Sequence, residues 1–301
     1  MRTCAVIINP ISGTSRGRLS VDELGAVIRR LGWDPEIAVS ERSGHAAAWV
    51  TEAARRHPLI IAAGGDGTVS EVATALADGA AAMAVLPTGS GNDFAEGIGI
   101  RSVRCGLEVI AHGQERRFDL GEFAGRPFVN SCGLFMNGEV SLRAADVPRF
   151  WGRFRYPLAT VPLLGRYRGP HARWRFDTSA GAPSTLEGEW TLAEVGNGSQ
   201  CGGGFRLTPL ADPGDGLLDF CLVRTMPVTT LLRTLPKGIK GDHLGSPHVE
   251  YVRASAAEVE CDEPIAVHWD GEADRLPAGS HGYRLRPGAL RVMVPKPRGG
   301  E

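Results

Sequence analysis

The segment Gly64–Thr68, with the sequence GGDGT, holds the residues best suited to chemistry in this chain. It follows Leu59–Ala63, an apolar run typical of a buried parallel strand. Its glycines let the backbone turn sharply and approach a ligand, and Thr68 is predicted to cap a helix that begins at Val69. The N–H groups of such a helix start favour an anion. Asp66 would repel a phosphate unless it holds Mg²⁺, orients a hydroxyl or pairs with a base.

A second glycine-rich turn, Thr88–Asn92, follows another predicted strand, Met83–Leu86. Asn9 and Ser40 end two further predicted strands, which span Thr3–Asn9 and Pro35–Ser40. Because the carboxyl ends of parallel strands meet at one sheet edge, we expect these segments to converge on a nucleotide. Each alone is equally compatible with an ordinary capped turn. Ser70 replaces the third glycine of a dinucleotide-binding loop, and the absence of any Gly-Lys dipeptide excludes a Walker A loop.

The surrounding pattern predicts two domains of different class. Helices expected from Ser20 or Asp22 to Leu31, over Gly44–Arg56 and over Val69–Leu76 alternate with the strands, which indicates a parallel α/β domain. After about residue 115 the alternation of short segments indicates an antiparallel β-sandwich with few helices. We place the domains at 1–122 and 123–288, with 289–301 returning to the first. The predicted strands of the second part are Arg117–Glu122, Pro127–Ser131, Arg173–Asp177, Trp190–Asn197, Leu218–Arg224, Val249–Ala254, Ala256–Cys261, Ala266–Trp269, Ala289–Val294 and, as a further candidate, Val228–Leu235.

Composition narrows the class of protein. The net charge is −1, so no global field attracts nucleic acid, and we expect no nucleic-acid partner. Six cysteines without a CxxC pair favour a reducing compartment over a disulfide or zinc framework. No signal peptide is evident, and the apolar run Ala80–Leu86 is too short to span a bilayer. We therefore expect a cytoplasmic protein, able to bind peripherally at the inner membrane face, and leave a homodimer open.

Together the motifs resemble those of the diacylglycerol kinase catalytic-domain family of lipid kinases, which includes bacterial lipid kinases, sphingosine kinases and ceramide kinases. They occur in the family's order and cover nearly the whole chain. The resemblance implies an N-terminal α/β nucleotide domain, a C-terminal antiparallel β-sandwich and an active site in the cleft between them. The matching segments are Asn9–Gly13, Ser43–Ala46, Gly64–Val72, Leu86–Ala95, Gly202–Phe205, Pro209–Asp219 and Asp270–Glu272.

The resemblance also implies which residues act. Asp270 would be the base that faces the substrate hydroxyl, with Glu272 beside it, and Asp66 is an alternative catalytic or metal-associated carboxylate. A carboxylate acceptor suffices because an alcohol loses its proton late in phosphoryl transfer. Without the resemblance, Asp270-Gly271-Glu272 is typical of a hairpin turn. ATP with Mg²⁺ would lie on Asn9, Ser40, Gly64, Gly65, Asp66, Gly67, Thr68, Thr88, Gly89, Ser90 and Asn92.

A structural Mg²⁺ site is implied at Asp212, Asp215 and the carbonyl of Leu217, with Asp93 as a link from that ion toward the nucleotide. The same segment is equally typical of a Pro-Gly turn. Two departures from the family pattern stand out. Thr14 follows Gly13 where a lysine is common, so that Arg16 or Arg18 would supply any charge needed. Asn137 stands where the family commonly has an aspartate near the lipid head group, which makes it a candidate substrate contact.

The segment Val147–Phe176 lacks acidic residues and mixes arginines with aromatics. This composition suits an anionic membrane surface, and equally a solvated face with its aromatics turned to the core. The arginines are Arg149, Arg153, Arg155, Arg166, Arg168, Arg173 and Arg175.

Three functions remain open from the sequence. The first is an ATP-dependent lipid kinase that phosphorylates a membrane-borne alcohol, most simply diacylglycerol. The second is an NAD kinase, which also uses a GGDGT loop. The third is a non-catalytic, nucleotide-dependent regulator that binds membranes, against which the acidic residues Asp66, Asp270 and Glu272 argue.

Overall fold

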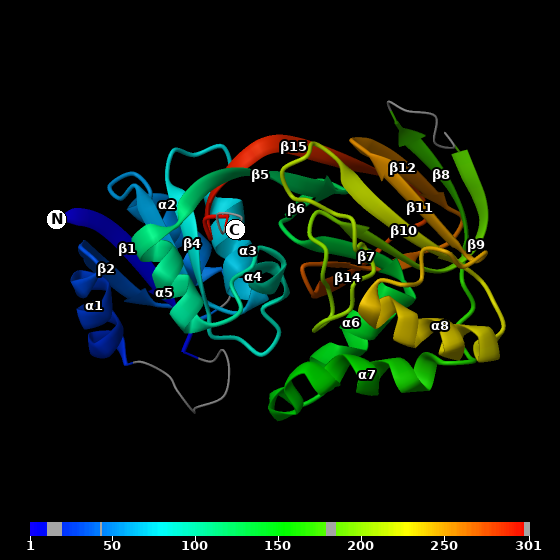
Figure 1. Ribbon diagram of the computed structural model, residues 1–301. Coiled ribbons are helices and arrows are strands. Elements are labelled where there is room, and N and C mark those ends of the chain that lie inside the picture. Colours follow the sequence, from blue (N-terminus) through cyan, green and yellow to red (C-terminus); the bar gives the residue numbers. More distant parts are fainter. Residues whose placement is uncertain (11–19, 43, 179–184, 298–301) are drawn as a thin grey trace. The chain divides into compact units, whose positions relative to one another are not determined.

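The computed structural model describes residues 1–10, 20–42, 44–178 and 185–297 (Figure 1). It divides into two compact units, of which unit 1 comprises Met1–Phe118 with Gly288–Glu301 and unit 2 comprises Asp119–Pro287. Unit 1 is an α/β domain with a parallel sheet, and unit 2 is a sandwich-like antiparallel β domain. The sequence pattern puts the corresponding boundaries at 122/123 and 288/289.

Four parallel strands in the order β4-β3-β1-β2 form the sheet of unit 1. Their carboxyl ends are level, because Ile8 pairs with both Val39 and Ala63, and Gly64 pairs with Pro87. The end of β15 joins this sheet through the pair Val292–Met83. The strands are β1 (Arg2–Ile8), β2 (Trp33–Val39), β3 (Leu59–Gly64) and β4 (Ala82–Pro87).

The helices of unit 1 begin and end where local chemistry dictates. The Ser20 hydroxyl accepts the Glu23 N–H at 3.2 Å and the Glu23 carboxylate accepts the Ser20 N–H at 2.7 Å, a capping box that fixes the start of α1. Leu24 and Ile28 then turn inward to the core of the sheet. The helices are α1 (Val21–Arg30), α2 (His45–Ala53), α3 (Asp66–Leu76), α4 (Asp93–Gly97) and α5 (Val103–His112).

Two antiparallel sheets that share β9 build unit 2. One runs β14-β13-β7-β9-β10-β11, and the other runs β9-β8-β12-β15-β5-β6. Trp174, Phe220 and Tyr283 lie in the buried core between them. The strands are β5 (Gln114–Phe123), β6 (Arg126–Phe128), β7 (Ser131–Phe135), β8 (His171–Asp177), β9 (Thr185–Gly196), β10 (Leu218–Arg224), β11 (Val249–Ala254), β12 (Ala256–Cys261), β13 (Ile265–Trp269), β14 (Glu272–Leu276) and β15 (Gly279–Val294).

Helices cover one face of the sheet formed by β9, β10 and β11 (Figure 1). They pack there through a second apolar cluster, to which Val140, Ala159 and Leu231 contribute. Among the described residues no helix combines the length and the apolarity needed to cross a bilayer. The helical segments are α6 (Met136–Asp146), η1 (Arg149–Phe154), α7 (Arg155–Thr160), η2 (Val161–Leu163) and α8 (Val228–Lys240).

Three predictions of local structure are wrong. Val228–Leu235 is helical, because Leu231 and Leu235 lie one turn apart and pack together on the second cluster. Helix α3 begins at Asp66 with Gly65 as its N-cap, so Thr68 lies inside its first turn. The expected single strand Pro127–Ser131 is interrupted, since the backbone N–H groups between β6 and β7 bond a side chain instead of a neighbouring strand. The loop expected at 179–184 lies outside the described residues.

Candidate active site

The two glycine-rich turns of unit 1 touch through their backbones. A Cβ built on Gly89 would lie 2.4 Å from the Cα of Gly65, which leaves no room for any side chain at position 89. The Thr88 N–H donates to the Gly64 carbonyl at 3.0 Å, extending the strand contact into the loops. Close packing of backbone on backbone explains why both turns carry glycine.

Asp66 and Asn92 fix the shape of the second turn. The Asp66 Oδ1 accepts the Phe94 N–H at 3.2 Å, so this carboxylate ties the start of α3 to the start of α4. Asn92 accepts the Gly89 N–H at 3.0 Å and donates to the Gly89 carbonyl at 2.9 Å. Asn92 adopts a φ of +61°, a conformation that asparagine tolerates better than most residues.

Asn9 and Ser40 lie at the same sheet edge. The Asn9 amide donates to the Thr68 hydroxyl at 3.2 Å, and its backbone N–H donates to the Ala63 carbonyl at 3.0 Å. The Ser40 N–H donates to the Ile8 carbonyl at 2.7 Å. The four segments predicted to converge therefore do meet. Ser90 is exposed, while Arg16, Arg18 and Ser43 lie outside the described residues.

The geometry of this edge fits a phosphate chain. The N-cap residue of α3 is Gly65, which has no side chain. No capping side chain therefore accepts a hydrogen bond from the N–H groups of the first turn. Nothing lies within 4 Å of a Cβ built on Gly67, which leaves open space beside those groups. Among the described residues no group of three or more His, Cys, Asp or Glu side chains is arranged to hold a metal ion.

In unit 2, Asp270 and Gly271 form the two-residue turn between β13 and β14, with φ values of +49° and +88°. The Asp270 carboxylate accepts the N–H groups of Val129 at 2.8 Å, Asn130 at 2.9 Å and Ser131 at 3.0 Å. Three backbone donors bond this carboxylate, two of them at Oδ1, and hold the bend between β6 and β7 in place. Asp270 is thus an anchor of the hairpin.

Glu272 differs from Asp270 in its surroundings. It begins β14 with 55% of its side chain exposed, and its Oε2 forms an ion pair with Arg126. The Arg126 guanidinium in turn lies 4.7 Å from the centroid of the Trp269 ring, a cation–π contact that orients it. Glu272 is therefore the more exposed carboxylate of this hairpin.

A buried glutamate beneath the hairpin was missed by the sequence interpretation. Glu194 is 1% exposed, and its Oε2 accepts the Asn137 amide at 2.7 Å and lies 3.4 Å from the His268 Nε2. Burial raises the pKa of Glu194, but the His268 charge and the hydrogen bonds from His268, Ser131 and Asn137 outweigh it, leaving that pKa below its ordinary value. The signal available in the sequence was a glutamate in the middle of the predicted strand Trp190–Asn197.

The Asn137 NH₂ group donates one of its hydrogens to Glu194 and is to that extent already engaged.

The loop predicted to hold a structural metal is held by hydrogen bonds and an ion pair. Asp212 accepts the Gly214 N–H at 3.1 Å, and Asp215 accepts the Leu217 N–H at 3.0 Å. The other Asp215 oxygen pairs with Arg253, whose Nε also lies 3.4 Å from the fully buried Asp219. A divalent cation on Asp215 would compete with this guanidinium, so the metal site stays a prediction and we assign no step to one here. Asp93, the predicted link, is buried at the start of α4.

Part of the arginine-rich segment Val147–Phe176 is a solvated face with its aromatic residue in the core, and part of it exposes aromatic side chains, as a membrane-binding surface would. Arg173 and Arg175 pair with glutamates on neighbouring strands, and Trp174 between them is fully buried. Arg155 donates to the Val147 carbonyl at 3.0 Å and so supports the fold. In contrast, Trp151 and Phe154 are exposed. The side chains of residues 149, 150 and 153 are not among those described.

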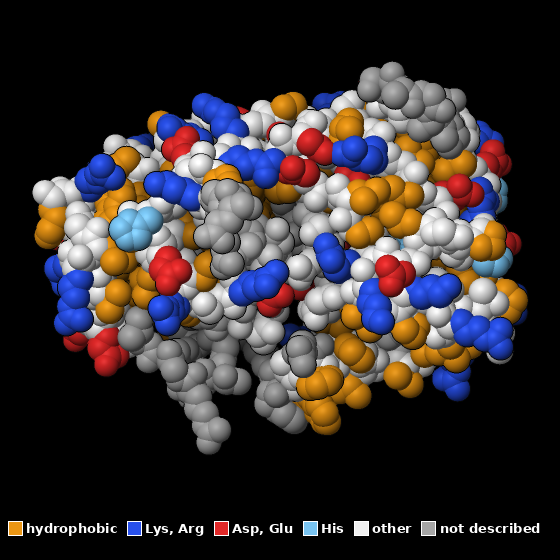
Figure 2. Space-filling view, viewed as in Figure 1, with side chains coloured by type: hydrophobic (Ala, Val, Ile, Leu, Met, Phe, Trp, Pro, Cys, Tyr) orange, Lys and Arg blue, Asp and Glu red, His pale blue; other side chains and the backbone are white. Residues whose placement is uncertain are grey.

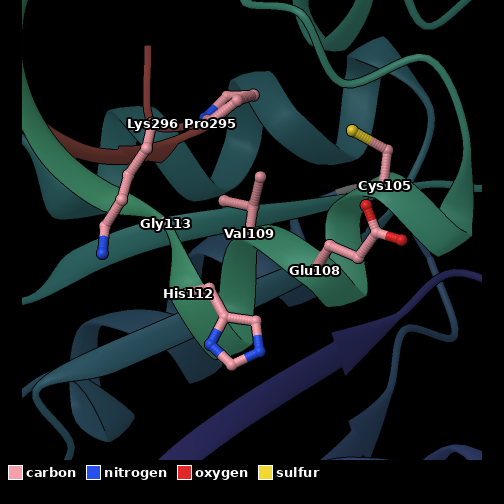
Figure 3. Close-up of a pocket in the computed structure, with 7 residues that line it drawn as sticks. All are labelled: Cys105, Glu108, Val109, His112, Gly113, Pro295 and Lys296. Atoms are coloured by element: carbon pink, nitrogen blue, oxygen red, sulfur yellow. The ribbon is translucent and has the colours of Figure 1, made fainter. Parts of the chain in front are cut away.

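A separate hollow of about 310 Å³ opens beside α5 (Figure 3). Val109, His112 and Lys296 are among the residues that line it, together with Cys105 and Glu108. None of the predicted nucleotide-binding residues lines this hollow, so it is distinct from the glycine-rich edge.

Comparison with known proteins agrees with this architecture. Residues 3–123 match the model of the diacylglycerol kinase catalytic domain, and residues 131–294 match that of the YegS C-terminal NAD kinase beta sandwich-like domain. The chain is 33% identical over 297 residues to a Pseudomonas aeruginosa protein named "probable lipid kinase YegS-like", with 95% of this chain and 93% of the relative covered. It is 27% identical over 305 residues to a Bacillus subtilis diacylglycerol kinase, with 98% and 97% covered.

A solved structure of a diacylglycerol kinase from Bacillus anthracis superposes with a TM-score of 0.72 at 21% identity, with 97% of this chain and 96% of that chain covered, and shows the shared fold. The two family models and the curated relatives place the chain in a class of lipid kinase-like phosphotransferases. The chain belongs to the diacylglycerol kinase and YegS-like family of lipid kinases, which confirms the resemblance found in its motifs.

Proposed function

We propose that the protein transfers the γ-phosphoryl group of ATP to a hydroxyl of a membrane lipid, with diacylglycerol as the first candidate. The observation that carries the proposal is the backbone contact between Gly65 and Gly89, because it brings two glycine-rich turns and a helix start to one sheet edge. This is the arrangement that a chain of phosphates requires. Family membership favours a lipid acceptor.

On the nucleotide side, the proposal assigns the phosphates to the loops Gly64–Thr68 and Thr88–Asn92, with Asn9 and Ser40 at the same edge. Bound Mg²⁺ would neutralise phosphate charge, and Asp66 is the residue that would hold it. The backbone N–H groups of the α3 start would bind and orient the phosphates. In this scheme Asp66 is a metal-associated carboxylate whose Oδ1 also bonds the α4 start.

On the acceptor side, the proposal assigns the role of base to Glu272. The lipid hydroxyl oxygen attacks the γ-phosphorus, the bond from that phosphorus to the β,γ-bridging oxygen breaks, and ADP leaves. Glu272 takes the hydroxyl proton late in the transfer. The sequence interpretation gave this role to Asp270, but three backbone donors on Asp270 favour its neighbour. Asn137 stays our candidate for the head-group contact, through its carbonyl oxygen.

The test is a transfer assay with γ-labelled ATP and a panel of acceptors that includes diacylglycerol, monoacylglycerol, sphingosine, ceramide and NAD. We expect label in a lipid product, with the strongest incorporation into diacylglycerol, and none in NAD. Label in NAD alone would replace the proposal by an NAD kinase activity. ATP binding without transfer to any acceptor would favour a non-catalytic regulator.

A further inference from the structure

Exposed apolar side chains gather on the helical side of unit 2. Four lie along η1, α7 and η2, and three lie along α8, where a water-facing helix surface ordinarily carries polar residues. In Figure 2 orange side chains are grouped over α7 and α8, with blue ones beside them. The residues are Trp151, Phe154, Leu158, Val161, Val228, Leu232 and Ile239.

The two groups belong to one surface. The inner faces of α7, η2 and α8 pack into the same apolar cluster through Ala159, Leu163 and Leu231. At their ends the segments approach each other, because a Cβ built on Gly165 would lie 3.3 Å from the Val228 side chain. Their outward faces therefore present a joint patch, which we term the helical face.

The charge around the helical face is of one sign. Neither Val147–Phe176 nor Thr225–Gly241 contains an aspartate or glutamate. Exposed basic side chains accompany the apolar ones, and in the described part of the chain none of them has an ion-pair partner. They are Arg166, Arg168, Arg233, Lys237 and Lys240.

The helical face also adjoins the hairpin assigned to the acceptor. A Cβ built on Gly271 would lie 3.2 Å from the Tyr156 hydroxyl of α7. In addition, Arg275 of β14 pairs with Glu139 of α6 at 2.7 Å. Whatever binds the outer side of α7 is therefore held close to Asp270 and Glu272.

We propose that the helical face docks on an anionic lipid bilayer, with its apolar side chains inserted at the interface and its basic side chains on the lipid phosphates. The proposal rests on the proposed function, to which it adds the surface that presents the lipid. A second copy of the chain fits less well, because a symmetric dimer through this face would set its basic groups against themselves.

The test compares two triple variants in vesicle cosedimentation without ATP. The apolar variant is Phe154→Ser/Val161→Ser/Ile239→Ser, whose side chains are all more than half exposed in the wild type, and its matched control is the equally exposed Leu210→Ser. The charge variant is Arg233→Gln/Lys237→Gln/Lys240→Gln. Vesicles of phosphatidylcholine with phosphatidylglycerol are compared with vesicles of phosphatidylcholine alone.

We expect the apolar variant to lose at least tenfold in vesicle affinity and Leu210→Ser to bind like wild type. The charge variant should lose about a hundredfold on anionic vesicles at low salt, with a smaller loss at high salt. Turnover on a short-chain, monomeric substrate should change little. Because binding is scored without ATP, it can succeed even if the transfer assay fails. Wild-type vesicle binding by the apolar variant, or a shift in oligomeric state as its only defect, would overturn the docking surface.

Discussion

The glycine-rich edge of unit 1 and the Asp270–Glu272 hairpin of unit 2 are held in shape by different interactions. At the first, shape comes from backbone packed on backbone, and the contact of Gly65 with Gly89 leaves no volume for a side chain. At the second, a carboxylate organises three backbone N–H groups and leaves its neighbour exposed. The first site should therefore be sensitive to added volume, and the second to lost charge.

Gly89→Val should produce the largest loss of ATP affinity. The valine Cβ would overlap the Gly65 backbone, so the two loops must separate and ATP affinity should fall by more than a hundredfold. The control is Gly97→Ala, which adds a methyl group to open space at the end of α4 and should leave the ATP Kd within about threefold. Isothermal titration of ATP on protein shown to be folded by circular dichroism decides between them. Equal ATP affinity in Gly89→Val and wild type would reduce both loops to ordinary turns.

Asp270→Asn should act on stability. The amide offers one acceptor oxygen to three backbone N–H groups and carries no charge, so we expect a loss of about 2–3 kcal/mol in the free energy of unfolding. Urea denaturation followed by fluorescence measures this loss. Unchanged stability together with a turnover loss of a thousandfold would restore Asp270 as the base.

These two sites also show what the sequence could reveal. The convergence of Asn9, Ser40 and the two glycine loops was predictable, because parallel strands must end at one edge. The division of roles between Asp270 and Glu272 was not, since it depends on the N–H groups of a bend that strand propensity alone misplaced.

The helices that cover unit 2 show a second limit of prediction from the sequence. A short apolar run such as Val228–Leu235 fits a strand or a helix, and its packing on the second cluster decides between them. The ion pair between Arg253 and Asp215 could not be predicted from the sequence, because the two residues are far apart in the chain and are brought together by the β10–β11 pairing. Distant pairing of this kind leaves no local signal.

Arg253→Gln should produce an intermediate effect. Asp219 is fully buried and would lose a positive neighbour, which we expect to cost about 2 kcal/mol of unfolding free energy. Without nucleotide, Mg²⁺ should leave the melting temperature of wild type unchanged, while the variant, with Asp215 released, should gain stability from the ion. A rise in the wild-type melting temperature on adding Mg²⁺ would show that a metal displaces the arginine.

His243 should give the smallest effect, visible in the pH dependence of stability. Its Nε2 donates to the Leu207 carbonyl at 3.0 Å, and burial lowers the pKa of His243. The folded state thus keeps this ring neutral while the unfolded chain takes up a proton below its ordinary pKa of about 6.5. Stability is therefore lost as pH falls below that value, with a slope of at most about 1.4 kcal/mol per pH unit.

Urea midpoints from pH 5 to pH 7 test this expectation. His243→Asn should flatten the slope relative to wild type, with substitution of the exposed His112 at the end of α5 as the control. Identical slopes in wild type and His243→Asn would assign the acid sensitivity to other groups.

Turnover of Glu272→Gln beside its ATP affinity tests the central assignment most directly. The substitution keeps the size of an exposed side chain, removes its capacity to accept a proton, and weakens an exposed contact with Arg126 that contributes little to stability. We expect the ATP Kd and the melting temperature to stay close to those of wild type while kcat for lipid phosphorylation falls by a factor on the order of 10² to 10⁴. A wild-type kcat in this variant would contradict the assignment of Glu272 as the base.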